Sequence, residues 1–189
     1  ADTLPALWDT LGTRAWRDGA EVLQWLREAT HSSTTEALQN KPNWMNASID
    51  EVFALPKVND MENALVQRSA DAQHVDQAWA DKTLKALHHQ SPLMLHVSLE
   101  QVRRGRQMDL ASELRMERDM VRHCFYTQHL NRSGVSSETV EGIRALAVDK
   151  DHQPKWNPGS IAEVTPEMVQ PFFNSPWPAA QHPLRHLKD

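Results

Sequence analysis

Ten histidines and one cysteine are the residues of this chain that most directly suggest metal binding or nucleophilic catalysis. His182 and His186 stand four residues apart, as two metal ligands on one helical turn would. No third ligand of a suitable type lies near them in the sequence, so a structural role is the better interpretation. Cys124 directly follows His123, whereas a thiolate–imidazole pair needs side chains that face each other across the fold. We therefore expect Cys124 to be a small buried residue.

A second arrangement that could support catalysis is the mixture of acidic and basic side chains over residues 113–122. The acids are Glu113, Glu117 and Asp119, and the bases are Arg115, Arg118 and Arg122. Neighbouring carboxylates can divide general-acid and general-base roles. Opposite charges at helical spacing more commonly pair with each other. We expect ion pairs on a solvated helix face.

The charge and hydropathy of the chain argue against two classes of partner. The formal net charge is −5, from 20 Lys and Arg against 25 Asp and Glu, whereas a nucleic-acid binder needs a basic face. Arg103, Arg104 and Arg106 form a short basic cluster without interleaved aromatic residues, and we place it at a helix C-terminus. Apolar runs are only a few residues long, so no membrane span is predicted.

Helical patterns account for nearly the whole chain, so the sequence predicts an all-α, multi-helix fold with no sheet of its own. Apolar residues recur at three- and four-residue spacing, and several predicted helices begin at a residue type that caps helices. The predicted caps are Asp18, Ser48, Ser91, Asp109 and Ser137. Ser48 would form a capping box with Glu51, and Pro92 suits the first position of its helix.

Residues 93–99 allow two interpretations. Apolar and polar residues largely alternate there, which is the period of a strand. Leu95, Leu99 and Val102 fit one face of a helix equally well. The Ser91-Pro92 start and the lack of a second strand nearby favour the helix.

Polar segments divide the chain into three predicted parts. Ser/Thr-rich and proline-containing breaks are predicted at 31–35 and 41–43. We expect a helical connector over 1–45, a helical domain over 46–173 and an extended tail over 174–189.

No secretory signal is visible near Ala1, and a single cysteine fits a reducing compartment.

A family resemblance is carried by two segments, SPLMLHVSLEQVRRGRQMDLASELRMERDMVRHCF and VEGIRALAVDKDHQPKWNP. The matching features are Ser91-Pro92 at a helix start, Glu141-Gly142 before Arg144-Ala145-Leu146, the Asp149-Lys150-Asp151 turn and Pro154-Lys155-Trp156. In this order and spacing they resemble the C-terminal region of 3-hydroxyisobutyryl-CoA hydrolases, which belong to the enoyl-CoA hydratase/isomerase (crotonase) superfamily. The resemblance covers roughly residues 50–173.

The resemblance implies a molecule in two parts. In this superfamily an N-terminal α/β core holds the oxyanion hole and the catalytic carboxylates, and a C-terminal helical region packs over it and often mediates self-association. Only the helical part has a counterpart here, so the resemblance assigns no catalytic residue, metal or cofactor to this chain. The expected partners are the crotonase core of the same protein, further copies of the chain, and an acyl-CoA that is the substrate of the parent protein.

Lys150 and Lys155 are the candidate CoA-binding residues. In related hydratases a lysine just after the corresponding helix approaches the nucleotide phosphate of CoA, and the resemblance carries this role to Lys150, with Lys155 as the substitute. An ammonium group is a suitable point-charge partner for phosphate. The alternative is that the Asp149-Lys150-Asp151 turn pairs its own charges.

The resemblance implies a function for the parent protein and leaves two others open. The expected function is hydrolysis of a short branched β-hydroxyacyl-CoA thioester, of the valine-catabolism type, with this chain inactive by itself. The expected location is the bacterial cytoplasm or the mitochondrial matrix. Hydratase or isomerase chemistry is one alternative and a non-catalytic assembly module is the other. The C-terminal helices do not choose among reactions on an acyl-CoA, because the reacting centre lies in the core.

Overall fold

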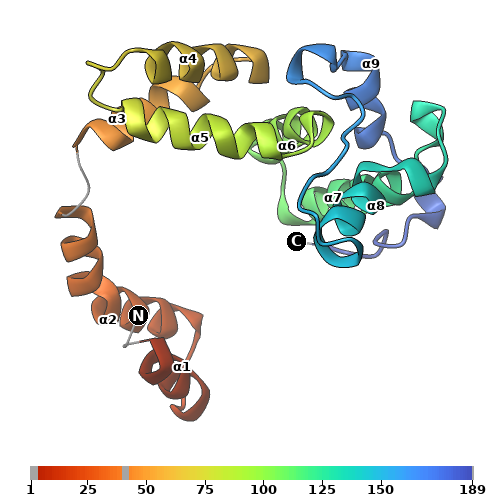
Figure 1. Cartoon of the computed structure of the whole chain (residues 1–189). Helices are drawn as coiled ribbons and strands as arrows, with labels where there is room; N and C mark the ends of the chain where they lie inside the picture. Colours follow the sequence, from red (N-terminus) through yellow and green to blue (C-terminus); the bar gives the residue numbers. More distant parts are fainter. Residues whose placement is uncertain (1–3, 40–42, 189) are drawn as a thin grey trace. The chain divides into compact units, whose positions relative to one another are not determined.

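Helices form the regular structure of the described chain (Figure 1). The computed structural model describes residues 4–39 and 43–188, and the side chains of these residues except 31–39 and 43–46. No strand occurs among them, which confirms the predicted all-α class. None of their helices combines the length and the apolar character needed to cross a membrane. The chain divides into two compact units, Ala1–Ala47 and Ser48–Asp189.

The first unit consists mainly of α1 (Leu4–Thr13) and α2 (Gly19–Gln39). Asp18 caps α2 as predicted, because its Oδ1 accepts the amide of Glu21 at 2.9 Å. The predicted break at 31–35 is wrong, since α2 continues through it. Ser and Thr cost only a few tenths of a kcal/mol each inside a helix, roughly, and do not by themselves end one. In the second predicted break, residues 41 and 42 lie outside the described chain.

The second unit holds the longer array of helices. They are α3 (Asn43–Phe53, which begins in the first unit), α4 (Val58–Ala70), α5 (Gln77–His89), α6 (Pro92–Gly105), α7 (Leu110–Phe125), α8 (Glu138–Ile143) and α9 (Pro166–Val169). One π-helical turn, η3 (Arg144–Val148), directly continues α8. Single 3₁₀ turns are η1 (Gln128–Leu130), η2 (Gly134–Ser136), η4 (Ile161–Glu163), η5 (Gln170–Phe173) and η6 (Ala179–Gln181).

Three of the predicted caps in this unit are confirmed. The side-chain oxygens of Ser91, Asp109 and Ser137 each accept the backbone amide three residues on, at 3.2, 2.7 and 3.2 Å. Residues 93–99 lie within α6, so the helical interpretation is correct and the strand alternative is wrong. A local hydrogen bond decides each of these starts, which is why the sequence predicts them.

Ser48 does not form the predicted capping box, because it lies inside α3 and is buried. Its hydroxyl bonds to the fully buried carboxylate of Asp76, which also accepts Arg68 Nη1 at 2.9 Å. Glu51 binds Arg68 at 2.6 Å and not the Ser48 amide. Burial would raise the pKa of Asp76, but the bonds from Ser48 and Arg68 and the nearby His74 hold that pKa below its ordinary value. A tertiary ion pair has replaced the local cap.

Two apolar clusters form the core of the second unit, and α6 contributes to both. The first consists of Leu93, Val97, Met116, Met120, Val169 and Phe172, and the second of Val52, Met61, Leu65 and Ala80. Leu93 and Val97 of α6 belong to the first, while Leu99 packs on the second. α6 therefore joins α3, α4 and α5 to α7 and α9.

The charged face of α7 does not form the predicted ion pairs. Asp119 is buried. Its Oδ1 accepts a hydrogen bond from Ser175 Oγ at 3.1 Å and lies 3.1 Å from His182 Nε2. Arg115 donates to the carbonyl oxygen of Leu184 at 3.1 Å. The partners come from the segment 174–188, which contains η6 and further turns. For Asp119 and Arg115, pairing with sequence neighbours was the wrong expectation because groups of the tail bind these side chains instead.

A pair of histidines packs where α7 meets η1 and η5. The rings of His123 and His129 meet edge-on with centroids 5.0 Å apart, and His129 lies 4.7 Å from the buried Phe172 ring. Both ring nitrogens of His129 are shielded from solvent without a hydrogen bond of normal geometry. Burial, and then the charges of His123 and Arg132, lower the pKa of His129 from 6.5 to about 4. The neutral ring is the form that fits the fold.

We predict that His129 makes the folded state sensitive to mild acid. Its folded pKa lies below the ordinary value, so its contribution to stability is complete above pH 6.5 and is lost as the pH falls towards 4. At about 1.4 kcal/mol per pKa unit, the loss amounts to at most about 3 kcal/mol. Urea unfolding from pH 7.5 to 4 measures it. His129→Phe should flatten this part of the profile, the exposed His186→Phe should not, and parallel profiles for all three proteins would refute the prediction.

Candidate functional site

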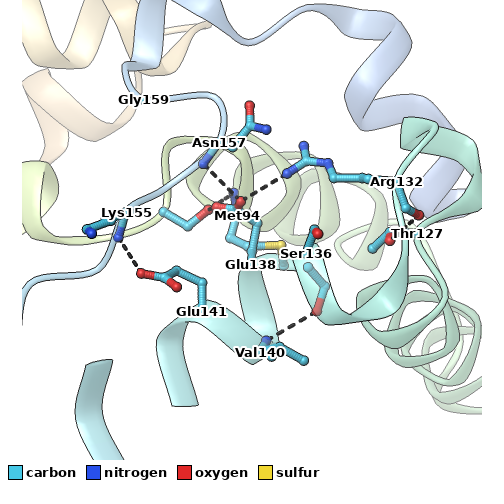
Figure 2. Close-up of polar contacts among 12 residues, drawn as sticks. Met94, Thr127, Arg132, Ser136, Glu138, Val140, Glu141, Lys155, Asn157 and Gly159 are labelled. Carbon is cyan, nitrogen blue, oxygen red and sulfur yellow. Dashed lines mark hydrogen bonds and ion pairs between the residues drawn. The ribbon is translucent and has the colours of Figure 1, made fainter. Parts of the chain in front are cut away.

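The segment Glu138–Pro158 is anchored by the buried carboxylate of Glu138 at the start of α8. That carboxylate accepts hydrogen bonds from the Ser91 hydroxyl, from Arg132 Nη1 at 3.4 Å and from the Asn157 amide at 3.2 Å. Figure 2 shows it between Arg132 and the backbone of Asn157. One side chain thus ties the first turn of α8 to the start of α6 and to the returning loop.

The guanidinium of Arg144 organises the turn that follows α8. Its Nε and Nη2 donate to the two carboxylate oxygens of Glu141 at 3.0 and 2.8 Å. Nη1 donates to Asp149 at 2.6 Å and to Asp151 at 2.7 Å, and Nη2 also reaches the Gln153 carbonyl at 3.0 Å. A planar five-donor group suits such a set of acceptors. The hydrogen bonds that Arg144 donates to the three carboxylates raise its pKa above the ordinary value.

Glu141 connects this centre to the returning loop. The same Oε1 that binds Arg144 accepts the backbone amide of Lys155 at 2.6 Å, and Figure 2 shows the two facing each other. The hydrogen bond from Arg144, followed by the one from the Lys155 amide, lowers the pKa of Glu141 from 4.5 to about 2. Glu141 is therefore ionised throughout the neutral range and is a fixed acceptor rather than a proton donor.

The backbone between these anchors turns sharply. The Asp149 amide donates to the Arg144 carbonyl at 2.8 Å, which closes the π turn, and the His152 amide donates to the Ala145 carbonyl at 3.1 Å. Lys150 and His152 both adopt left-handed backbone angles, with φ of 56° and 54°. Such angles are uncommon for residues other than glycine. The carboxylates bound to Arg144 hold the chain in this conformation.

The two predicted CoA-binding lysines both lie on this turn and are both exposed. Asp149 and Asp151 bind Arg144, and within the described chain Lys150 takes part in no ion pair. The turn thus does not pair its charges through Lys150. Lys155 is held through its backbone amide. The hydrogen bond from Arg144 lowers the pKa of Asp151, and the Lys155 ammonium adds a smaller effect in the same direction.

An apolar pocket of about 430 Å³ lies beside the turn, over α8 and η3. Trp156 forms one wall, and its Nε1 donates to the His89 carbonyl at 3.1 Å. A Cβ on Gly142 would meet the Trp156 ring at 3.3 Å, so a glycine here lets the indole lie close to α8. Further lining residues are Ile143, Ala145, Leu146 and Pro154. A second pocket of about 260 Å³ adjoins it and shares Glu138 and Trp156.

The other residues considered from the sequence have structural surroundings. His182 is buried against Asp119. Cys124 is half-buried beside Thr139, and burial raises the pKa of its thiol. No group of three His, Cys, Asp or Glu side chains in the described chain is arranged to hold a metal ion. Arg144 was not predicted from the sequence as the central residue of this turn. The pattern that could have identified it is a single arginine with three acids close to it in the sequence, at positions 141, 149 and 151.

Comparison with known proteins identifies the family. A sequence profile described as enoyl-CoA hydratase/isomerase matches residues 1–173. The chain belongs to the enoyl-CoA hydratase/isomerase family. The match takes in the whole of α8, η3 and the turn with Lys150 and Lys155, and it ends just before the segment 174–188 that contacts α7.

Individual relatives of the family differ in what they are called. The 3-hydroxyisobutyryl-CoA hydrolase-like protein 5 of Arabidopsis thaliana is 32% identical over 148 residues, which cover 75% of this chain and 36% of that protein. The mitochondrial 3-hydroxyisobutyryl-CoA hydrolase of Xenopus laevis is 27% identical over a match that covers 77% of this chain and 34% of that protein. The small ribosomal subunit protein mS47 of Arabidopsis thaliana is 34% identical over a match that covers 66% of this chain and 28% of that protein. The chain thus spans about a third of the length of these relatives.

We predict that Glu141→Gln lowers the melting temperature at pH 7, because the neutral amide cannot replace the charged acceptor of Arg144. The folded pKa of Glu141 lies below the ordinary value, so its contribution is complete above pH 4.5 and is lost as the pH falls towards 2. Thermal melts across this range should show the two proteins converging at the acid end. Glu113→Gln, at a carboxylate without an ion pair in the described chain, is the control. A constant difference between wild type and Glu141→Gln would contradict the prediction.

Proposed function

We propose that this chain is the helical C-terminal part of an acyl-CoA hydrolase that resembles 3-hydroxyisobutyryl-CoA hydrolases, and that residues 138–158 contact the CoA moiety. Family membership and the names of several relatives support this chemistry. The observation that carries the proposal is the turn held by Arg144. Within the described chain its Lys150 has no ion pair, and its His152 and Pro154 line an apolar pocket.

The chemistry of CoA fits this combination of groups. Its phosphates favour an ammonium partner, and its pantetheine arm and adenine ring offer apolar surface for a pocket lined by Trp156 and the aliphatic side chains of α8 and η3. In the proposed whole protein, a preorganised oxyanion hole and a carboxylate of the core act on the thioester. The present chain contributes binding and no reacting group. Its location is then a compartment that supplies acyl-CoA, either the mitochondrial matrix or a bacterial cytoplasm.

A thioesterase assay tests the division of labour. The 189-residue chain should hydrolyse 3-hydroxyisobutyryl-CoA no faster than buffer alone, while the same chain joined to its crotonase core should turn it over. Turnover by the isolated chain at the rate of the joined protein would overturn the proposal. Hydration of an enoyl-CoA by the joined protein, in place of hydrolysis, would support the hydratase alternative.

We predict that Lys150→Gln weakens CoA binding by the joined protein by about tenfold to a hundredfold, since a charge-assisted hydrogen bond is worth roughly 1.5–3 kcal/mol. Dephospho-CoA lacks the phosphate on the ribose, so its affinity should change much less if Lys150 contacts that group. Isothermal titration calorimetry with both ligands, on Lys150→Gln, Lys155→Gln and the exposed Lys82→Gln as control, separates the two candidates. Wild-type affinity in both Lys150→Gln and Lys155→Gln would refute the assignment.

A second candidate function is a non-catalytic assembly module. It is favoured by the similarity to a relative that is called a ribosomal subunit protein. Exposed apolar side chains on and beside α7 fit an interaction surface; they are Leu110, Val121, Phe125 and Val135. An upstream reading frame with an intact crotonase core would favour the enzyme, and an absent or degraded core would favour the module. Under either function we expect sedimentation to show self-association of the chain. A strictly monomeric chain would contradict this expectation.

A further inference from the structure

A pocket of about 330 Å³ lies between α4, α6 and α9, apart from the segment proposed to contact CoA. Three stretches that are far apart in the sequence build it, 56–59, 96–103 and 164–170. Its volume is at the lower end of the range for small-ligand pockets, roughly 300–1,000 Å³. Its apolar walls include the buried side chains of Val58 and Val169.

Two of the side chains that line this pocket, Glu100 and Gln170, have their acceptor oxygens engaged by Arg104. Arg104 Nε donates to the Glu100 carboxylate at 2.7 Å, and Arg104 Nη2 donates to the Gln170 side-chain oxygen at 2.7 Å. One guanidinium thus neutralises the one lining carboxylate and takes up the amide acceptor. The flanking acids Asp60 and Glu167 are not among the lining residues.

The positive charges that line the pocket have no acidic partner. Arg103 is fixed by two neutral acceptors, the carbonyl oxygens of Pro56 and Leu55 at 2.6 and 3.0 Å. Lys57 is exposed and makes no ion pair in the described chain. The lining side chains, two positive and one negative, therefore give the pocket a net positive charge in a chain whose net charge is −5.

We infer that this pocket binds a small organic anion, a carboxylate with a short apolar body. The carboxylate is recognised by the ammonium of Lys57 and the fixed guanidinium of Arg103, and the aliphatic part lies against Val58 and Val169. A carboxylate suits these donors because its two oxygens can accept charge-assisted hydrogen bonds from an ammonium and a guanidinium. The inference does not depend on the CoA proposal, since no residue is shared with the pockets beside Trp156.

The test is an NMR titration of the full 189-residue chain with sodium butyrate, against sodium chloride at equal concentration. Saturable shifts are expected at the amides of residues 57–59 and 164–170, with butyramide binding at least about tenfold more weakly because it lacks the charge. Lys57→Gln should weaken butyrate binding about fivefold to tenfold. It is preferred to an Arg103 variant, because Arg103 also holds two backbone carbonyls.

Lys82→Gln, at an exposed lysine of α5 outside the pocket, should leave butyrate binding unchanged. No saturable shift up to about 50 mM butyrate, a concentration well above a weak millimolar Kd, would overturn the inference. Equal binding of butyrate and butyramide, or equal effects of Lys57→Gln and Lys82→Gln, would overturn it as well.

Discussion

The guanidinium of Arg144 gathers Glu141, Asp149, Asp151 and the Gln153 carbonyl around one planar group. These acceptors come from a helix, from the end of a π turn and from the loop beyond it. Without a common cation, three neighbouring carboxylates would repel one another. The turn that presents Lys150 can exist at neutral pH because Arg144 holds its acids together.

Other features of the region follow from that constraint. Glu141, fixed by Arg144, binds the Lys155 amide and so determines where the loop returns. The return places Trp156 against Gly142, with its indole nitrogen on the His89 carbonyl, and this forms a wall of the apolar pocket. Glu138 fixes the other end through Asn157. The proposed contact with CoA therefore relies on a rigid charged support behind an exposed lysine and an apolar wall.

Local signals in the sequence predict helix starts well and tertiary partners poorly. Ser91, Asp109 and Ser137 cap their helices because the bond joins residues three apart. Ser48 has the same local pattern, yet a buried Asp76 outcompetes its cap. The arginines of α7 have acidic neighbours at helical spacing, but Arg115 binds backbone carbonyls of the tail. Lys150 adopts a left-handed conformation although it is not a glycine. Residue types therefore did not predict the shape of the turn, although they did identify Lys150 and Lys155 as candidate binding residues.

Amide hydrogen exchange in Arg144→Lys tests most directly whether this guanidinium holds the turn. Lysine keeps the charge and loses the planar fork, so the amides of Lys155 and His152 should exchange at least about tenfold faster than in the wild-type chain. The Val97 amide in the core should exchange at its original rate. Unchanged protection of Lys155 and His152 would show that the turn keeps its shape without Arg144 and would contradict its central role.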